Sequence, residues 1–405
     1  EPLKLLNINL LLCINVVGMT TILKAIALAA LNPLMSQSGF VPYWLVRRGQ
    51  DSATISGNVL FNEQDVYVWK PRHSLENKVE VTLKRLEDTE LLLSSFEMIK
   101  SDFGHLRNDR SPAFLIVGYA ASRRVEDSER LDLAARRKTR LLRYERVAGL
   151  FENYISLIPL ASWLPNFRKE NPGRFKQVVN LINRLLPEGA SFEAELEQGE
   201  YLFEVNGTKA PFGALSDGYR AYIGWIADLL YHICMGAPKG AKLVDNRGIV
   251  LVDEIDLHLH PEWQRSVIAT ISQTLPNLQF VFTTHSPIVA GSVNKENIFV
   301  METTADGASV VKQYDERIYG LNAEQVLLSS YFNLKTTRAE SFVDELKTLS
   351  VQAGKGDLEA ALTFMEKLSG QDATTNGTAV LSAKKNSITA RKKKSSAPAK
   401  TKRKR

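Results

Sequence analysis

Two adjacent carboxylates, Asp253 and Glu254, directly follow the apolar run at residues 249–252, and His285 directly follows a second apolar run, LQFVFTT. An uninterrupted apolar run predicts a strand covered on both faces of a parallel sheet, and the carboxyl ends of such strands open onto a ligand crevice. In a nucleotide hydrolase, the first acid of such a pair holds Mg²⁺ and the second orients or deprotonates the attacking water. We therefore predict that Asp253 is a metal ligand and Glu254 a catalytic base. The structural alternative is an acidic cap at a strand-to-helix junction.

The residues around these acids carry a family resemblance. LVDEIDLHLHP followed by FTTHSP resembles the Walker B, D-loop and H-loop of ABC-type ATPases, in particular the clade of SMC, Rad50, RecF and OLD-like proteins. The D-loop of this clade commonly carries a histidine before a proline, here His258, His260 and Pro261. The resemblance implies that ATP is the cofactor, together with Mg²⁺, and that His285 is a catalytic switch histidine that contacts the γ-phosphate. Without its neighbours, a lone histidine would be interpreted as structural.

An upstream segment, FGALSDGYRAYIGWIADLL at residues 212–230, resembles the ABC signature, LSxG followed by a helix. A serine hydroxyl and free amides at a helix N-terminus form an anion site, and glycine allows the backbone to approach closely. An ordinary serine N-cap is the structural alternative. In this family the signature of one subunit completes the nucleotide site of another. The resemblance therefore implies a head-to-tail homodimer or higher oligomer in which Ser216 and Gly218 contact ATP in trans.

The segment CINVVGMTT at residues 13–21 is similar to the phosphate-loop form GxNGxGKTT of the same family. The matching residues, which are predicted to bind nucleotide, are Asn15, Gly18, Thr20 and Thr21. By the resemblance, Thr20 is also a second Mg²⁺ ligand. The following ILKAIALAAL has helical spacing, as expected after a phosphate loop.

The same segment departs from the family form at three positions. Cys13 and Val16 replace glycines, and Met19 replaces the lysine that reaches the β- and γ-phosphate oxygens. Because a lost lysine removes a charge-assisted contact worth about 1.5–3 kcal/mol, we expect little hydrolysis. Three explanations are open: a naturally degenerate loop, an N-terminal segment that differs from the natural sequence, or a phosphate loop outside this chain.

The apolar strands and the helical patterns around these residues predict an α/β fold. The resemblance implies a P-loop NTPase of the ABC-ATPase head type, with a mixed core sheet, an antiparallel β-lobe and a short helical insert. Residues 53–70 alternate as a strand hairpin and residues 79–83 as a further strand of that lobe. Residues 151–186 are predicted to be helical, with Pro159, Pro165 and Pro172 as interruptions.

The predicted division of the chain has five parts. They are an N-terminal ATPase lobe with the degenerate phosphate loop (1–125), a helical insert (126–190), a C-terminal ATPase lobe with the signature, Walker B and H-loop (191–315), a C-terminal helical region (316–372) and a disordered basic tail (373–405).

Residues 112–124, PAFLIVGYAASRR, form an apolar run that resembles the GYGxxR segment of OLD-like defence ATPases. The arginine pair at its end has two alternative interpretations. Arg123 and Arg124 either reach phosphate or a partner subunit, or are solvated at the start of a loop.

Composition limits the class of protein. The chain has 405 residues, 44% of them hydrophobic, and only two cysteines, which excludes a disulfide framework and a cysteine metal cluster. The apolar stretch at residues 10–34 is interrupted by polar side chains, so we expect no membrane span and a cytoplasmic protein. The net charge is +6, yet residues 383–405 contain eleven Lys or Arg and no acid. This tail is predicted to be either a nucleic-acid-binding arm or a solubilising terminus.

The predicted C-terminal helices carry no acidic, HNH or Cys-His nuclease pattern. ATPases of this type without their own effector resemble the ATPase halves of two-gene anti-phage systems such as Septu, PARIS and certain retrons. The resemblance implies a bacterial ATP-binding and hydrolysing subunit that oligomerises and controls a separate effector protein, a nuclease. Two alternatives remain: a DNA-repair or recombination ATPase acting directly on DNA, and a catalytically silent pseudo-ATPase scaffold.

Overall fold

The computed structural model describes residues 5–13, 18–35, 40, 45–60, 65, 76–87, 90–94, 113–125, 142–152, 155–238 and 240–369. The chain divides into two compact units, residues 1–335 and 336–405. The predictions for Asn15, Val16 and the basic tail lie outside the described residues. None of the described helices has the length and apolarity that crossing a membrane requires.

A six-stranded sheet forms the centre of the first unit, with the order β14-β13-β1-β12-β11-β5. Its strands are β1 (Ile8–Cys13), β5 (Ile116–Tyr119), β11 (Gly248–Val252), β12 (Leu278–Thr284), β13 (Ile298–Thr303) and β14 (Ser309–Lys312). All neighbours pair in parallel except β14, which is antiparallel to β13. The mixed sheet and the two apolar strands that precede the candidate site are therefore confirmed.

Side chains of the central strands alternate between two hydrophobic clusters. Val250 and Val252 pack in one cluster, whereas Leu251 between them packs in the other. On β12, Phe280 and Phe282 join the first cluster and Val281 joins the second. This alternation explains the continuous apolar runs, because a strand covered on both faces leaves no position for a polar side chain in its middle.

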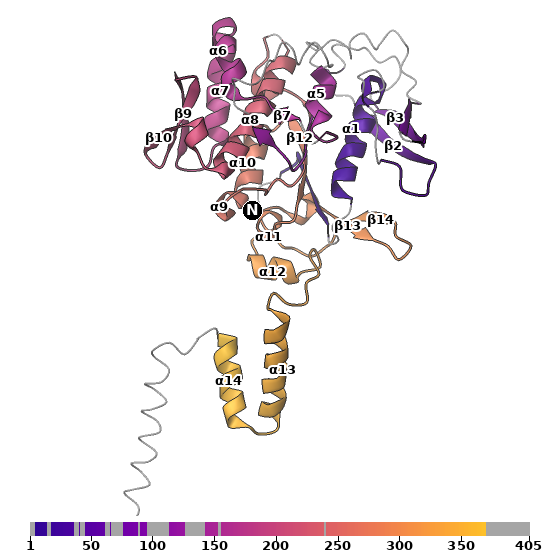
Figure 1. The fold of residues 1–405 in the computed structure, drawn as a ribbon, viewed down its shortest axis with the longest axis vertical. Helices are drawn as coiled ribbons and strands as arrows, with labels where there is room; N and C mark the ends of the chain where they lie inside the picture. Colours follow the sequence, from indigo (N-terminus) through magenta and orange to yellow (C-terminus); the bar gives the residue numbers. More distant parts are fainter. Residues whose placement is uncertain are drawn as a thin grey trace, which may run out of the picture. The chain divides into compact units, whose positions relative to one another are not determined.

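Different elements cover the two faces of this sheet (Figure 1). The first cluster includes residues of α6 (Leu160–Glu170), α7 (Pro172–Leu185), α8 (Asp217–Gly236), α10 (Val267–Thr274) and the sheet of β8 (Ala190–Glu197), β9 (Glu200–Val205) and β10 (Thr208–Pro211). The second includes residues of α1 (Met19–Met35), α5 (Leu142–Ala148) and the sheet of β2 (Ser52–Leu60), β3 (Glu76–Arg85) and β4 (Glu90–Ser94).

One local prediction is tested only in part, and one requires correction. The first strand of the expected hairpin at residues 53–70 lies in β2, which pairs antiparallel with β3, whereas residues 61–64 and 66–70 lie outside the described residues. The predicted strand 79–83 lies inside β3. Val79, Val81 and Leu83 alternate as buried side chains, so β3 is the strand that joins β2 to the core. Pro165 lies within α6 and does not interrupt it; the buried side chains of this helix, including Trp163 and Phe167, hold it against the core.

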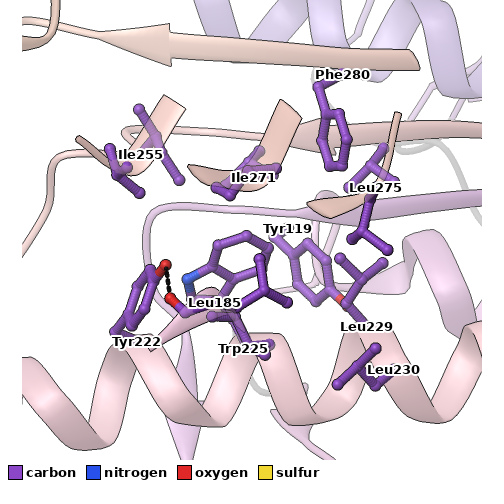
Figure 2. Close-up of a cluster of buried hydrophobic side chains, with 14 of the residues drawn as sticks. Tyr119, Leu185, Tyr222, Trp225, Leu229, Leu230, Ile255, Ile271, Leu275 and Phe280 are labelled. Atoms are coloured by element: carbon purple, nitrogen blue, oxygen red, sulfur yellow. Dashed lines mark hydrogen bonds between the residues drawn. The ribbon is translucent and has the colours of Figure 1, made fainter. Parts of the chain in front are cut away.

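Helix α8 is fixed to the sheet and to α7 by buried aromatic residues (Figure 2). The Trp225 ring lies 5.8 Å from the Tyr119 ring, centroid to centroid, in an edge-on arrangement. The Tyr222 hydroxyl donates to the Leu185 carbonyl at 2.8 Å, which satisfies a phenol that is otherwise buried among apolar side chains. The helix that follows the signature is therefore rigidly attached to the end of β5.

The remaining elements are short or peripheral. They are β6 (Arg124–Val125), β7 (Ser156–Leu157), α9 (Pro261–Gln264), α11 (Pro287–Ala290), α12 (Ala323–Leu328) and the 3₁₀ helices η2 (Phe212–Ala214), η3 (Leu243–Asp245) and η4 (Lys295–Asn297). The second unit contains α13 (Glu340–Gly354) and α14 (Leu358–Ser369), which contact each other. An ion pair of 2.6 Å between Lys367 and Glu345 joins these two helices.

Candidate active site

The chain leaves several parallel strands at one edge of the central sheet. Leu12 of β1 lies opposite Thr284 of β12, and Val252 of β11 lies opposite both Phe282 of β12 and Tyr119 of β5. The phosphate-loop segment, the acid pair, His285 and the segment after β5 must therefore emerge side by side. This is the edge at which open α/β sheets bind ligands.

Asp253 is held by two hydroxyl groups. The residue is 5% exposed, and its Oδ2 accepts a hydrogen bond from Thr20 Oγ1 at 2.6 Å. Its Oδ1 accepts a second hydrogen bond from Thr283 Oγ1 at 2.5 Å. Three elements distant in sequence, α1, β11 and β12, thus meet at one carboxylate, and both predicted metal ligands are in contact.

The Thr20 and Asp253 oxygens fit a magnesium ion. Ligand oxygens at adjacent positions of an octahedral Mg²⁺, each at roughly 2.0–2.1 Å, lie about 2.9 Å apart. The observed distance of 2.6 Å between Thr20 Oγ1 and Asp253 Oδ2 is only slightly shorter than that value. Within the described ranges no cluster of three or more His, Cys, Asp or Glu side chains could hold a metal. Mg²⁺ commonly takes one or two carboxylates together with phosphate and water, and here one carboxylate and one hydroxyl lie in contact.

The start of α1 combines a glycine in a special backbone conformation with a first turn free of acids, and it lacks the usual lysine. Gly18 has φ +120°, a conformation that side chains disfavour, and α1 has no acid in its first turn. Thr21 is exposed in that turn. Met19 is only 6% exposed and belongs to the second hydrophobic cluster. The side chain at the lysine position is therefore part of the core and does not extend toward the site.

Glu254 has an unusual backbone conformation that its neighbours stabilise. Its φ is +47°, in the left-handed region that is uncommon for residues other than glycine. The Glu254 amide donates to Thr283 Oγ1 at 2.7 Å, and its carbonyl accepts from Arg123 Nη2 at 2.9 Å and from the Leu257 amide at 3.0 Å. Thr283 consequently holds both acids, since the same hydroxyl donates to Asp253.

His285 is exposed directly after β12, and its two neighbours are firmly held. The Thr284 hydroxyl donates to the Asp256 carboxylate. The Ser286 hydroxyl donates to Gln264 Oε1 at 2.7 Å and accepts from two amides of α11. The imidazole is thus available to a ligand at the sheet edge while the backbone on both sides is fixed.

The signature segment packs against the D-loop of the same chain. Ser216 is the exposed N-cap residue of α8, and its side chain makes no capping hydrogen bond. A Cβ on Gly218 would lie 2.6 Å from the His258 carbonyl oxygen, so only glycine allows this approach. Among the described residues, no hydrogen bond joins Ser216 to either acid, and action in trans remains a prediction.

The structure shows contacts of two residues at the site that sequence reasoning missed. Thr283 was not predicted, although a threonine pair inside the apolar strand LQFVFTT was a visible signal. Arg123 makes contacts that neither interpretation included: its Nη1 donates to the Asp253 carbonyl at 2.7 Å, and its Nη2 to the Glu254 carbonyl. Burial lowers the pKa of Arg123 to about 10, while nearby acids, Asp253 first, oppose that shift. Arg124 is exposed.

Comparisons with known proteins show which sequences this chain is similar to. A family model described as "AAA domain, putative AbiEii toxin, Type IV TA system" matches residues 20–290. The Septu protein PtuA from Bacillus mycoides (strain KBAB4) is 25% identical over 326 residues, which cover 80% of this chain and 40% of that protein. The retron Ec83 probable ATPase from Escherichia coli is 31% identical over 147 residues, covering 36% of this chain and 27% of that protein. The chain thus spans less than half the length of these curated relatives.

Among solved structures, the SMC head bound to the C-winged helix domain of ScpA shares 15% sequence identity with this chain. The match covers 77% of this chain and 92% of that one, with a TM-score of 0.45. The predicted resemblance to ABC-type ATPases, including those of Septu and retron systems, is confirmed by the family model and the named relatives. Because the family model matches more than half of the residues, the chain belongs to the AAA-domain family described as "AAA domain, putative AbiEii toxin, Type IV TA system".

Proposed function

We propose that this chain is the ABC-type ATPase subunit of a bacterial anti-phage system. It binds ATP with Mg²⁺, oligomerises through its ATPase heads and controls a separate effector nuclease. The observation that carries the ATPase part is the contact of Thr20 with Asp253, beside Glu254, at the sheet edge. The defence role is supported by relatives named as a Septu protein and a retron ATPase.

Each residue of the site has a distinct role in this proposal. Thr20 and Asp253 hold Mg²⁺, which when bound supplies positive charge that offsets the charge of the phosphates. Glu254 accepts a proton from the attacking water, and its backbone is fixed at both the amide and the carbonyl. His285 contacts the γ-phosphate. The amides at Gly18 and the first turn of α1 bind phosphate oxygens, together with Thr21 and with Asn15, which lies outside the described residues.

Ser216 and Gly218 complete the nucleotide site of a second copy in this proposal. Ser216 is exposed at the N-terminus of α8, a helix of 20 residues. Because the first amides of a helix have no partner within it and carry partial positive charge, this end suits the phosphates of a nucleotide held by another head. The close contact of Gly218 with the D-loop would present both segments to the partner together.

A second candidate function, a pseudo-ATPase scaffold, is favoured by one specific observation. Met19 stands where the family has a lysine, and it is packed in the core at 6% exposure. A loop in this form lacks the charge that reaches the β- and γ-phosphates. In that case the fold serves only to build an oligomer that holds the effector. The third alternative, direct action on DNA, depends on the basic tail, which lies outside the described residues.

One experiment separates the ATPase proposal from the scaffold. Binding of ATP with Mg²⁺ is measured by calorimetry, hydrolysis by phosphate release and assembly by light scattering, for the parent, Glu254→Gln and Glu262→Gln. Glu262 is the matched control because its side chain is 81% exposed on the neighbouring helix α9. The ATPase proposal expects Glu254→Gln to bind ATP, to lose hydrolysis and to accumulate an ATP-bound oligomer. Absence of ATP binding in every variant, with unchanged assembly, would leave the scaffold.

A further inference from the structure

Arg123 holds two successive peptide carbonyls at the point where the candidate catalytic residues leave the sheet. Its two terminal nitrogens donate to the carbonyl oxygens of Asp253 and Glu254, at 2.7 and 2.9 Å. A planar guanidinium presents paired donors in a fixed geometry, which a lysine ammonium does not. The contact is therefore specific to arginine and acts on the backbone of both acids.

The backbone that Arg123 contacts is in a conformation that needs support. With φ at +47°, Glu254 turns the chain out of the extended geometry of β11. A residue with a Cβ adopts this region only when its surroundings stabilise it. Thr283 holds the amide side of the Glu254 residue, and Arg123 holds its carbonyl side. Together the two contacts determine the direction in which the Glu254 side chain leaves the backbone.

We propose that Arg123 is a positioning residue for hydrolysis: its guanidinium fixes the Asp253 and Glu254 carbonyls and thereby aims the Glu254 carboxylate at the attacking water. This inference rests on the proposed ATPase function. Arg123 touches neither the nucleotide nor the water in this role.

The segment that carries Arg123 is itself fixed to the signature helix. Tyr119, the last residue of β5, donates from its hydroxyl to Asp228 Oδ2 at 2.7 Å, and Asp228 lies on α8. The other Asp228 oxygen accepts from the Ile158 amide at 2.8 Å, and the Asp253 amide donates to the Tyr119 carbonyl at 2.8 Å. A displacement of α8 on binding a second head would therefore move the base of the Arg123 segment. The same contacts give the signature helix a physical connection to the Glu254 backbone.

Arg123 can be reached by small molecules. It lines a cavity of about 580 Å³, whose other walls include His258 of the D-loop and Arg220 of α8. A methylguanidinium ion is much smaller than this cavity. If Arg123 is shortened to alanine, such an ion can occupy the vacated position and donate to the same two carbonyls. This permits a rescue test that a purely structural role would not pass.

The test compares Arg123→Ala and Arg123→Lys with Arg124→Ala, whose exposed side chain provides the matched control. Calorimetry gives the Kd for ATP with Mg²⁺, and phosphate release gives kcat. We expect kcat to fall about 10- to 100-fold in Arg123→Ala, because a small misplacement of a catalytic group has an effect of that size. The Kd should stay within about threefold of the parent, since the loss concerns positioning and not binding. Added methylguanidinium should restore kcat in Arg123→Ala only, and Arg123→Lys should remain impaired.

Two results would overturn the inference: an unchanged kcat in Arg123→Ala, or a loss that methylguanidinium does not restore. If the parent itself does not hydrolyse ATP, the proposed function fails while the positioning contact is still tested. Hydrogen–deuterium exchange of the amides of residues 253–257 then serves as the readout. Faster exchange in Arg123→Ala, reversed by methylguanidinium, supports the inference, and exchange equal to that of Arg124→Ala refutes it.

Discussion

Replacing Thr283 by valine tests how the acid pair is held. Thr283 is fully buried, donates to Asp253 Oδ1 at 2.5 Å and accepts from the Glu254 amide at 2.7 Å. Valine has nearly the same shape but removes both contacts. A hydrogen bond to a charged group contributes about 1.5–3 kcal/mol, and an orphaned buried amide costs about 1–3 kcal/mol. We therefore expect Thr283→Val to lower the free energy of unfolding by about 2.5–6 kcal/mol.

The matched control is Thr283→Ser, which keeps the hydroxyl and loses one methyl group, at a cost of about 1 kcal/mol. Urea denaturation of the parent and both variants at neutral pH gives the difference directly. Because the chain has two units, the midpoint of the transition that reports on residues 1–335 is the quantity to compare. If Thr283→Val falls within about 1 kcal/mol of Thr283→Ser, the hydroxyl does not hold the acid pair as the geometry indicates.

Two further predictions concern the phosphate loop and the packing of the signature helix. Met19→Lys should tighten binding of ATP with Mg²⁺ by about 10- to 150-fold, the equivalent of a charge-assisted contact of about 1.5–3 kcal/mol. Calorimetry beside the parent tests this, and equal affinities would show that the buried position cannot direct a lysine to phosphate. For Tyr222, burial raises the pKa above the ordinary value of 10.0. The folded state therefore keeps the Tyr222 phenol protonated to a higher pH than the unfolded state does. The stabilisation that the protonated phenol provides is present below about pH 10 and is lost as the pH rises further. Tyr222→Phe loses the hydrogen bond to Leu185, which should lower the free energy of unfolding by about 0.5–1.5 kcal/mol at about pH 8. The difference in this free energy between the parent and the variant should be smaller at about pH 10.5. A difference in urea midpoints that does not depend on pH would refute the second prediction.

The sequence predicted the central strands and the candidate acids well because their signals are local. Residues 249–252 are apolar throughout, as a strand buried on both faces must be, and the acids follow at its end. The helix beginning at Met19 and the helix beginning at Asp217 were also predicted, since each follows a recognisable loop. The prediction of a hairpin within residues 53–70 and a separate strand at 79–83 did not include the pairing of β2 with β3. Alternation identifies a strand but does not identify its partner across an intervening segment.

Contacts between segments far apart in the chain could not be predicted from local sequence patterns. Nothing in the local pattern around Arg123 indicates that its guanidinium meets the carbonyls of Asp253 and Glu254, because hydrogen bonds to backbone carbonyls leave no residue-type signature on the accepting side. The role of Thr283 depends equally on the register of β11 against β12. The sequence did not show where the Met19 side chain lies, because its burial depends on the packing of the core.

The sequence by itself determined which groups are available for chemistry and at which strand ends they lie. Residue type and apolar periodicity are encoded locally, and parallel strands deliver their carboxyl ends to one edge. Only the tertiary structure decided that Thr20 and Thr283 share the Asp253 carboxylate, that Arg123 fixes the Glu254 backbone, and that the Met19 side chain packs into the core. These contacts depend on the register and packing of segments far apart in the chain, and no single stretch of sequence encodes them.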